Sequence, residues 1–189
     1  MRRREVLTAA AVLVLRAAAG PALAQDRPPL TGRFLLEDQD GRPVDQDSYG
    51  GRLRLMTFGY TYCPDICPTT LATMAAALDR LGPQAAQVVP IFVSVDPGRD
   101  TPAHLKQYLA AFGPRFVGLT GTPAQVADAA RNFRVRYAVR PAENGDPAAY
   151  TVDHTAGIYV MDRQGLFLAK LGHLEGAEGV AERLRSYLG

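Results

Sequence analysis

Residues 58–68, Phe58-Gly-Tyr-Thr-Tyr-Cys-Pro-Asp-Ile-Cys-Pro68, contain both cysteines of the 189-residue chain. The apolar run before them, residues 53–58, predicts a buried strand, and the periodicity of residues 69–81 predicts a helix with Pro68 in its first position. Cys63 and Cys67 therefore lie where a strand leads into a helix, whose positive dipole end favours thiolate. The stretch predicts sulfur chemistry, either metal binding or thiol exchange.

The Cys-x-x-x-Cys spacing has one residue more than the Cys-x-x-Cys of thioredoxin-like redox motifs. The extra residue leaves room for an ion between the two sulfurs. A metal would need a further donor, and His154 in Tyr150-Thr-Val-Asp-His-Thr155 is the best candidate. The alternative is a structural disulfide with His154 as an ordinary loop histidine. Because a bridge across so short a loop removes little chain entropy, the alternative is poorly motivated.

The first 24 residues have the pattern of an export signal. A basic cluster precedes an Ala/Val/Leu run, and Ala22-Leu-Ala24 provides the small residues that a signal peptidase requires. We expect cleavage before Gln25 and a periplasmic mature chain of residues 25–189. The segment Arg3-Arg4-Glu-Val-Leu7 also resembles a twin-arginine signal. An uncleaved N-terminal membrane anchor is the alternative.

The charge balance changes when the signal is removed. The full chain has 21 Lys and Arg against 19 Asp and Glu, and the signal holds four arginines and one glutamate, which leaves 17 against 18. A net charge of −1 gives no reason to expect a nucleic-acid partner. The mature chain has the length of one domain, large enough to bury a core without a disulfide.

The remaining pattern alternates strands and helices. We expect strands at residues 33–36, 53–58, 88–95 and 116–119 and helices at 69–81, 101–112 and 122–133. Asp40-Gly41 predicts the turn of an N-terminal hairpin. We expect a projecting hairpin or loop at residues 134–151, and a final hairpin at residues 158–170 before a helix at 176–188. This order predicts an α/β fold: a thioredoxin-like sandwich with a central mixed sheet flanked by helices.

The predicted fold brings a distant histidine toward the cysteines. Thioredoxins place a proline just before the strand that opens the last hairpin, where it faces their cysteines. Residues 153–158 contain no proline, and His154 lies in this segment. We therefore expect His154 to project toward Cys63 and Cys67.

Four groups of motifs occur in order from about Thr31 to the C-terminus: residues 58–68; Ser94-Val-Asp-Pro97 with Arg99-Asp-Thr-Pro102; Phe116-Val-Gly-Leu-Thr-Gly121; and Val152-Asp-His-Thr155 with Ile158-Tyr-Val-Met-Asp162. Together they resemble the SCO/SenC copper-chaperone family. The resemblance implies a thioredoxin-like fold and one copper ion, Cu(I) or Cu(II), held by Cys63, Cys67 and His154. It also implies a role in supplying or preparing the binuclear copper site of cytochrome c oxidase.

The donor chemistry agrees with this resemblance. Two thiolates and one imidazole form a soft set that suits Cu(I), and a further oxygen ligand would hold Cu(II). Zinc usually takes a fourth protein ligand, and none is evident. The implied partners are the copper-accepting subunit of cytochrome c oxidase, other periplasmic copper carriers and a thiol reductant, with the protein itself a monomer. The alternative function is a thiol–disulfide oxidoreductase that reduces the cysteines of the oxidase copper subunit, with Cys63 and Cys67 as its redox-active pair.

Two acidic residues are candidates to support the site. Asp65, between the cysteines, could tune the thiol pKa, with a solvated loop carboxylate as the alternative. Asp96 follows a buried strand near the expected site, although a turn before a proline explains it equally well.

The remaining candidates are aromatic. Tyr60 and Tyr62 could wall the metal site or contact a partner, with ordinary packing as the alternative. We expect His104 to be solvated on a polar helix face and His173 to be structural.

Overall fold

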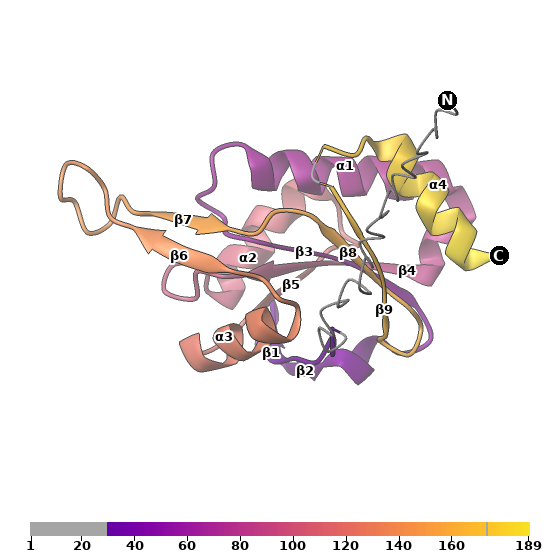
Figure 1. The fold of residues 1–189 in the computed structure, drawn as a ribbon, viewed down its shortest axis with the longest axis horizontal. Coiled ribbons are helices and arrows are strands. Elements are labelled where there is room, and N and C mark those ends of the chain that lie inside the picture. Colours follow the sequence, from indigo (N-terminus) through magenta and orange to yellow (C-terminus); the bar gives the residue numbers. More distant parts are fainter. Residues whose placement is uncertain (1–29, 173) are drawn as a thin grey trace, which may run out of the picture.

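Two parallel strands form the centre of the molecule in a computed structural model that describes residues 30–172 and 174–189 (Figure 1). Strands β3 (Leu53–Gly59) and β4 (Val88–Ser94) are buried at every residue. Continuous apolar runs of this kind are typical of parallel strands covered on both faces. Both strands end at the edge of the sheet where the cysteine loop begins.

The central sheet has seven strands in the order β2-β1-β5-β4-β3-β8-β9. Strand β5 (Val117–Thr120) runs parallel to β4, whereas β8 (Ile158–Met161) lies antiparallel to β3 and pairs with β9 (Phe167–Leu171). Strands β1 (Leu35–Asp38) and β2 (Pro43–Asp45) form the N-terminal hairpin beside β5. The predictions of a mixed sheet, an N-terminal hairpin and a final hairpin are confirmed.

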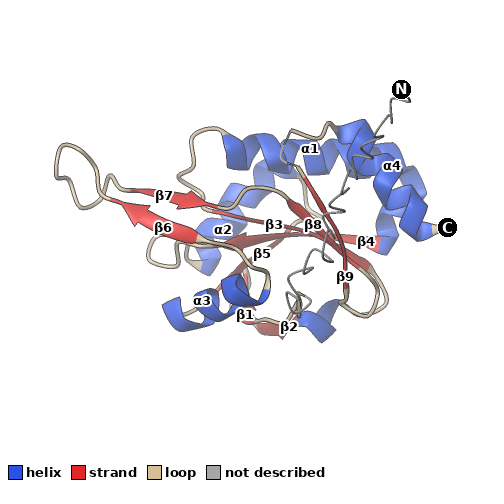
Figure 2. Ribbon diagram, viewed as in Figure 1, coloured by secondary structure: helices blue, strands red, loops and turns tan. Residues whose placement is uncertain are grey.

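Helices cover both faces of this sheet (Figure 2). Buried side chains of α1 (Ile66–Leu81), α2 (Pro102–Leu109) and α4 (Ala177–Leu188) share one apolar cluster with Leu55 of β3. Helix α3 (Pro123–Asn132) packs on the opposite face, in a second cluster with Met56. Adjacent residues of β3 thus point to opposite faces, as the pleat requires.

A second sheet of two strands projects from the body of the protein (Figure 1). Strands β6 (Tyr137–Arg140) and β7 (Thr151–His154) pair antiparallel, with Tyr137 opposite His154. This is the projecting hairpin predicted for residues 134–151. It continues to residue 154, so that His154 ends a strand and does not lie in a loop.

Several predicted boundaries were wrong by a few residues. Helix α1 begins at Ile66, so Pro68 occupies its third position and not its first. Proline is tolerated there because the first amides of a helix have no intrahelical acceptor. Strand β1 lies two residues later than expected, and it extends to Asp38 because Glu37 and Asp38 pair with β5. The helix predicted for residues 101–112 consists of α2, which ends at Leu109, and a 3₁₀ turn over Ala110–Phe112.

The export signal predicted for residues 1–24, and His173, lie outside the described residues. Within residues 30–172 and 174–189, no helix combines the length and the apolar character needed to cross a membrane.

Candidate metal centre

The two cysteines come from the junction between β3 and α1. Cys63 lies in the loop, where its N–H donates to the carbonyl oxygen of Tyr60, and Cys67 lies in the first turn of α1. The N–H of Cys67 donates to Cys63 Sγ at 3.5 Å. An amide at a helix start that points at a sulfur stabilises negative charge on it. Both residues are free cysteines.

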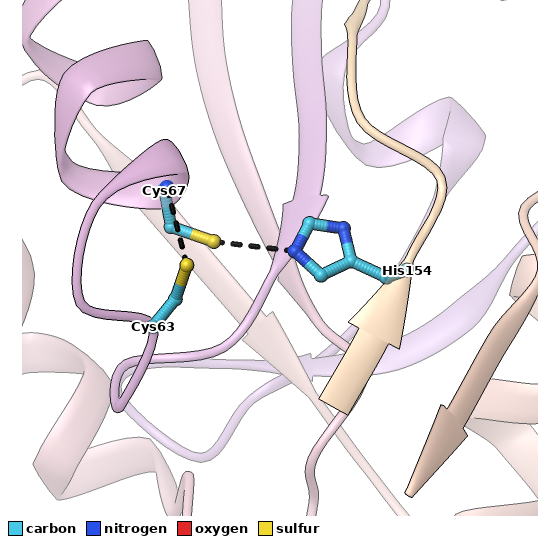
Figure 3. Close-up of side chains that lie close together, drawn as sticks. All are labelled: Cys63, Cys67 and His154. Carbon is cyan, nitrogen blue, oxygen red and sulfur yellow. Dashed lines mark hydrogen bonds between the residues drawn. The ribbon is translucent and has the colours of Figure 1, made fainter. Parts of the chain in front are cut away.

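His154 reaches the cysteines from the end of β7 (Figure 3). Its Nε2 lies 3.4 Å from Cys67 Sγ. The donor atoms of Cys63, Cys67 and His154 all lie within 4.8 Å of one another, and theirs is the one cluster of its kind in the part of the chain that the structure describes. The structure therefore brings together the three residues that the sequence analysis predicted as metal ligands.

The imidazole of His154 is oriented to act as a ligand. Its Nδ1 lies 3.5 Å from the carbonyl oxygen of Thr155, to which only a protonated Nδ1 can donate. That tautomer leaves the lone pair of Nε2 facing the sulfurs. Burial lowers the pKa of His154 and so favours the neutral ring. The ring of Tyr60 packs edge-to-face against the imidazole of His154. The two ring planes lie at 89° and their centroids are 6.0 Å apart.

Cys67 does not have the thiolate character expected from the helix dipole alone. Burial raises the pKa of the Cys67 thiol, and the charges of Cys63 and Asp100 raise it further. Since the ordinary pKa of a thiol already lies above neutral and burial raises it, Cys67 holds its proton at neutral pH, and an incoming metal has to displace that proton. Gly59 permits this buried position, because a Cβ there would lie 2.6 Å from Cys67 Sγ.

A buried carboxylate beneath the cysteine loop was missed by the sequence analysis. Asp100 is fully buried and accepts hydrogen bonds from the Thr61 N–H (3.1 Å), the Thr61 hydroxyl (2.6 Å) and the Ser94 hydroxyl (2.6 Å). His104 Nε2 lies 2.9 Å from Thr61 Oγ1, and its ring stacks on Tyr62. The expectation that His104 is solvated is therefore wrong. Asp100 belongs to the Arg99-Asp-Thr-Pro102 motif, but the Thr-Pro after it indicates a helix start and gives no sign of a contact with Thr61.

Asp65 and Asp96 take different positions. Asp65 is exposed at the start of α1, where its carboxylate accepts a 3.4 Å hydrogen bond from the Thr69 hydroxyl. Asp96 is buried, and its carboxylate binds Arg99 and the Tyr150 hydroxyl. The carboxylate of Asp96 thus contacts Arg99 and Tyr150 and none of the three donors.

The two tyrosines also differ. Tyr60 is buried against His154 and forms one wall of the site. Tyr62, one residue before Cys63, is 55% exposed. This exposure leaves the Tyr62 ring accessible to a partner.

Comparison with known proteins places this geometry in a family. The SCO1/SenC family profile matches residues 23–189. The chain belongs to the SCO1/SenC family. Protein sco1 of Schizosaccharomyces pombe is 40% identical over 164 residues, an alignment that covers 85% of this chain and 62% of the fission yeast protein. The chain thus spans less than two thirds of that relative.

Solved SCO structures share the fold. Bradyrhizobium japonicum ScoI with copper bound is 44% identical, with a TM-score of 0.76 and coverage of 84% of this chain and 99% of that one. Yeast Sco1 with copper bound is 34% identical, with a TM-score of 0.77 and coverage of 85% and 89%. These matches confirm the predicted α/β fold of the SCO thioredoxin-like type.

Proposed function

We propose that this SCO protein is a copper chaperone: it binds one copper ion through Cys63, Cys67 and His154 and carries it to the copper-accepting subunit of cytochrome c oxidase. One observation carries the proposal, the convergence of two sulfurs and an imidazole nitrogen within 4.8 Å. Family membership and the two relatives solved with copper bound support it.

The three donors suit a cargo that must be both held and released. Two thiolates and one imidazole favour Cu(I) over harder cations. Cys67 is buried, whereas Cys63 and His154 are both partly exposed. A three-coordinate ion keeps a position open, and a ligand from the recipient can enter there before the chaperone's own donors leave. We expect the exchange to begin at Cys63, because it is the most accessible sulfur.

Copper stoichiometry tests the ligand set. Reduced protein should bind one copper, and Cys63→Ser should abolish tight Cu(I) binding. His154→Ala should weaken Cu(II) more than Cu(I), because two thiolates alone can hold Cu(I) nearly linearly. His104→Ala is the matched control, since it removes a half-buried histidine that contacts Thr61 and not the sulfurs. X-ray absorption with only oxygen and nitrogen neighbours around copper would contradict the assignment.

The proposed place of action is the periplasm. The basis is the signal pattern of residues 1–24, with Ala22 and Ala24 at the small-residue positions before Gln25. N-terminal sequencing of protein from the periplasmic fraction should begin at Gln25. A chain that keeps its first residues in the membrane fraction would favour the anchored alternative.

A second candidate function is thiol–disulfide exchange with the oxidase copper subunit. The observation that favours it is the unequal pair, a partly exposed Cys63 beside a buried Cys67. In this reaction the Cys63 thiolate attacks a substrate disulfide and forms a mixed disulfide. Cys67, losing its proton, then attacks Cys63 Sγ, which releases the reduced substrate and leaves a Cys63–Cys67 disulfide. An external thiol reductant reduces this disulfide back to two thiols.

Complementation separates the two functions. Copper delivery needs His154, whereas exchange depends mainly on the thiols. In cells lacking the wild-type protein, at low copper, His154→Ala should restore oxidase activity almost as poorly as Cys63→Ser does. The variants must be compared at matched abundance, since degradation of a destabilised protein mimics lost function. Full rescue by His154→Ala, with failure of both cysteine variants, would put the oxidoreductase first.

A further inference from the structure

Arg99 connects three segments around the metal centre. Its side chain is 15% exposed, and its Nε donates to Asp96 Oδ2 at 2.6 Å. Its Nη1 donates to the carbonyl oxygens of Tyr150 (3.0 Å) and Ala148 (3.3 Å), in the segment that leads into β7. Asp96 in turn accepts a 2.7 Å hydrogen bond from the Tyr150 hydroxyl. One guanidinium therefore ties the end of β4 to the return of the projecting hairpin.

The same guanidinium lies among three tyrosine rings. Its Cζ is 3.5 Å from the ring centroid of Tyr150, 4.6 Å from that of Tyr62 and 5.7 Å from that of Tyr60. A planar cation stacks on aromatic faces in a way that lysine does not reproduce. Tyr60 and Tyr62 belong to the cysteine loop, so Arg99 also fixes that loop against the hairpin.

His154 depends on where this hairpin lies. It stands four residues after Tyr150, at the far end of β7, and Val152 is the one fully buried residue of that strand. All of β6 is at least partly exposed. With so little apolar contact, the hairpin has a weak hydrophobic anchor of its own. The Arg99 contacts supply a polar one, next to the strand that carries the imidazole.

We propose that Arg99 is a positioning residue for the copper site: it fixes β7 against the cysteine loop and thereby holds His154 Nε2 beside Cys67 Sγ. Tyr150 and Asp96 complete the contact. The inference rests on the proposed function for its copper readout, whereas the contacts of Arg99 with the hairpin can be tested without copper. Residues that orient a metal-ligating histidine typically change metal affinity by about 10- to 100-fold when removed.

A double-mutant cycle tests the inference. Arg99→Ala should weaken Cu(II) binding by about 10- to 100-fold and remove the imidazole nitrogen coupling from the electron paramagnetic resonance spectrum. Because both changes remove the same ligand, His154→Ala should add little in the Arg99→Ala background. Arg140→Ala is the matched control. Arg140 belongs to the same hairpin and pairs with Asp153 beside His154, but it is exposed. Its loss should leave the affinity and the spectrum unchanged.

Two further measurements keep the outcome interpretable. Tyr150→Phe removes the hydroxyl bond to Asp96 and leaves the ring under Arg99, so it should shift Cu(II) affinity in the same direction by less. In metal-free Arg99→Ala, amide hydrogen exchange of residues 151–154 should be faster than in Arg140→Ala.

One result overturns the role of Arg99 and leaves the proposed function intact. In that result His154→Ala weakens Cu(II) binding as expected, whereas folded Arg99→Ala keeps the Cu(II) affinity and the imidazole coupling of the wild type. If Arg99→Ala does not fold, an unchanged affinity in Tyr150→Phe overturns it. If His154→Ala binds copper like the wild type, the proposed ligand set fails instead. The metal-free exchange result still decides whether Arg99 holds the hairpin.

Discussion

Replacing Asp100 by alanine should destabilise the whole domain and loosen the cysteine loop. Asp100 is fully buried, and its carboxylate accepts one hydrogen bond from the backbone of Thr61 and two from the hydroxyls of Thr61 and Ser94. The Thr61 bonds hold the loop two residues before Cys63. The variant removes the acceptor of all three bonds and leaves their donors at a fully buried Ser94 and a partly buried Thr61.

The magnitude follows from these three bonds. A buried donor left without an acceptor costs about 1–3 kcal/mol. The Thr61 hydroxyl can turn away and remain bonded to His104, which leaves the Thr61 N–H and the Ser94 hydroxyl as the main losses. Desolvation of the carboxylate, which raises the pKa of Asp100, offsets part of the gain in the wild type. We therefore expect Asp100→Ala to lower the free energy of unfolding by about 3 kcal/mol at neutral pH.

Urea denaturation measures this change. The chain contains no tryptophan and eight tyrosines, so circular dichroism and tyrosine fluorescence are the suitable signals. With a slope of about 2 kcal/mol per molar urea, the midpoint should fall by about 1.5 M without a change in slope. Asp65→Ala, an exposed aspartate of the same loop, should change stability by less than about 0.5 kcal/mol. A loss below about 1 kcal/mol in Asp100→Ala would refute the reasoning, because a carboxylate that anchors the loop cannot be removed so cheaply.

The pH dependence gives an independent check on Asp100. Burial raises its pKa in the folded state above the unfolded value near 3.9. The folded state then binds more protons, and stability from this group is fully present below about pH 3.9 and falls as the pH rises through the folded pKa. The difference in stability between wild type and Asp100→Ala should therefore be largest at acid pH.

Three further predictions concern the thiols and one strained residue. Burial raises the pKa of the Cys67 thiol, so copper binding has to release the proton of that thiol. The apparent Cu(I) affinity should therefore rise about tenfold per pH unit from this group. Competition with a Cu(I) chelator between pH 6 and 8 measures the dependence, and an affinity that does not change with pH would contradict the prediction. Protein kept as the Cys63–Cys67 disulfide should bind no copper tightly, since a disulfide sulfur is a poor ligand; undiminished binding in a copper titration would exclude the cysteines as ligands. Arg134 has φ 54° after the end of α3, a conformation that costs a non-glycine residue about 1–2 kcal/mol, so Arg134→Gly should raise the thermal midpoint, and a lower midpoint would mean that its side chain contributes more than the strain costs.

The sequence was sufficient for the architecture because the central strands are dictated by continuous apolar runs. Residues 53–58 and 88–95 could be buried on both faces only between helices, and the cap signals at Thr101 and Thr122 located two of those helices. Boundaries were less predictable, because they depend on tertiary contacts. Strand β1 extends to Asp38 through pairing with β5, and α1 begins at Ile66, before the apolar periodicity of residues 69–81 is visible.

The three donors of the metal centre were predictable for a different reason than the residues around them. The Cys-x-x-x-Cys spacing itself indicates a metal or redox site, and the predicted order of strands and helices placed His154 opposite the cysteine loop. Arg99 and Asp100 are ordinary charged residues before a Thr-Pro helix start, and their partners lie as far away as Tyr150 and Thr61. No local pattern reports such contacts, since they arise only when the hairpin, β4 and the cysteine loop are brought together. The ligands could thus be identified from local motifs, whereas the geometry that makes them a site depends on polar contacts between residues up to 54 positions apart in the chain.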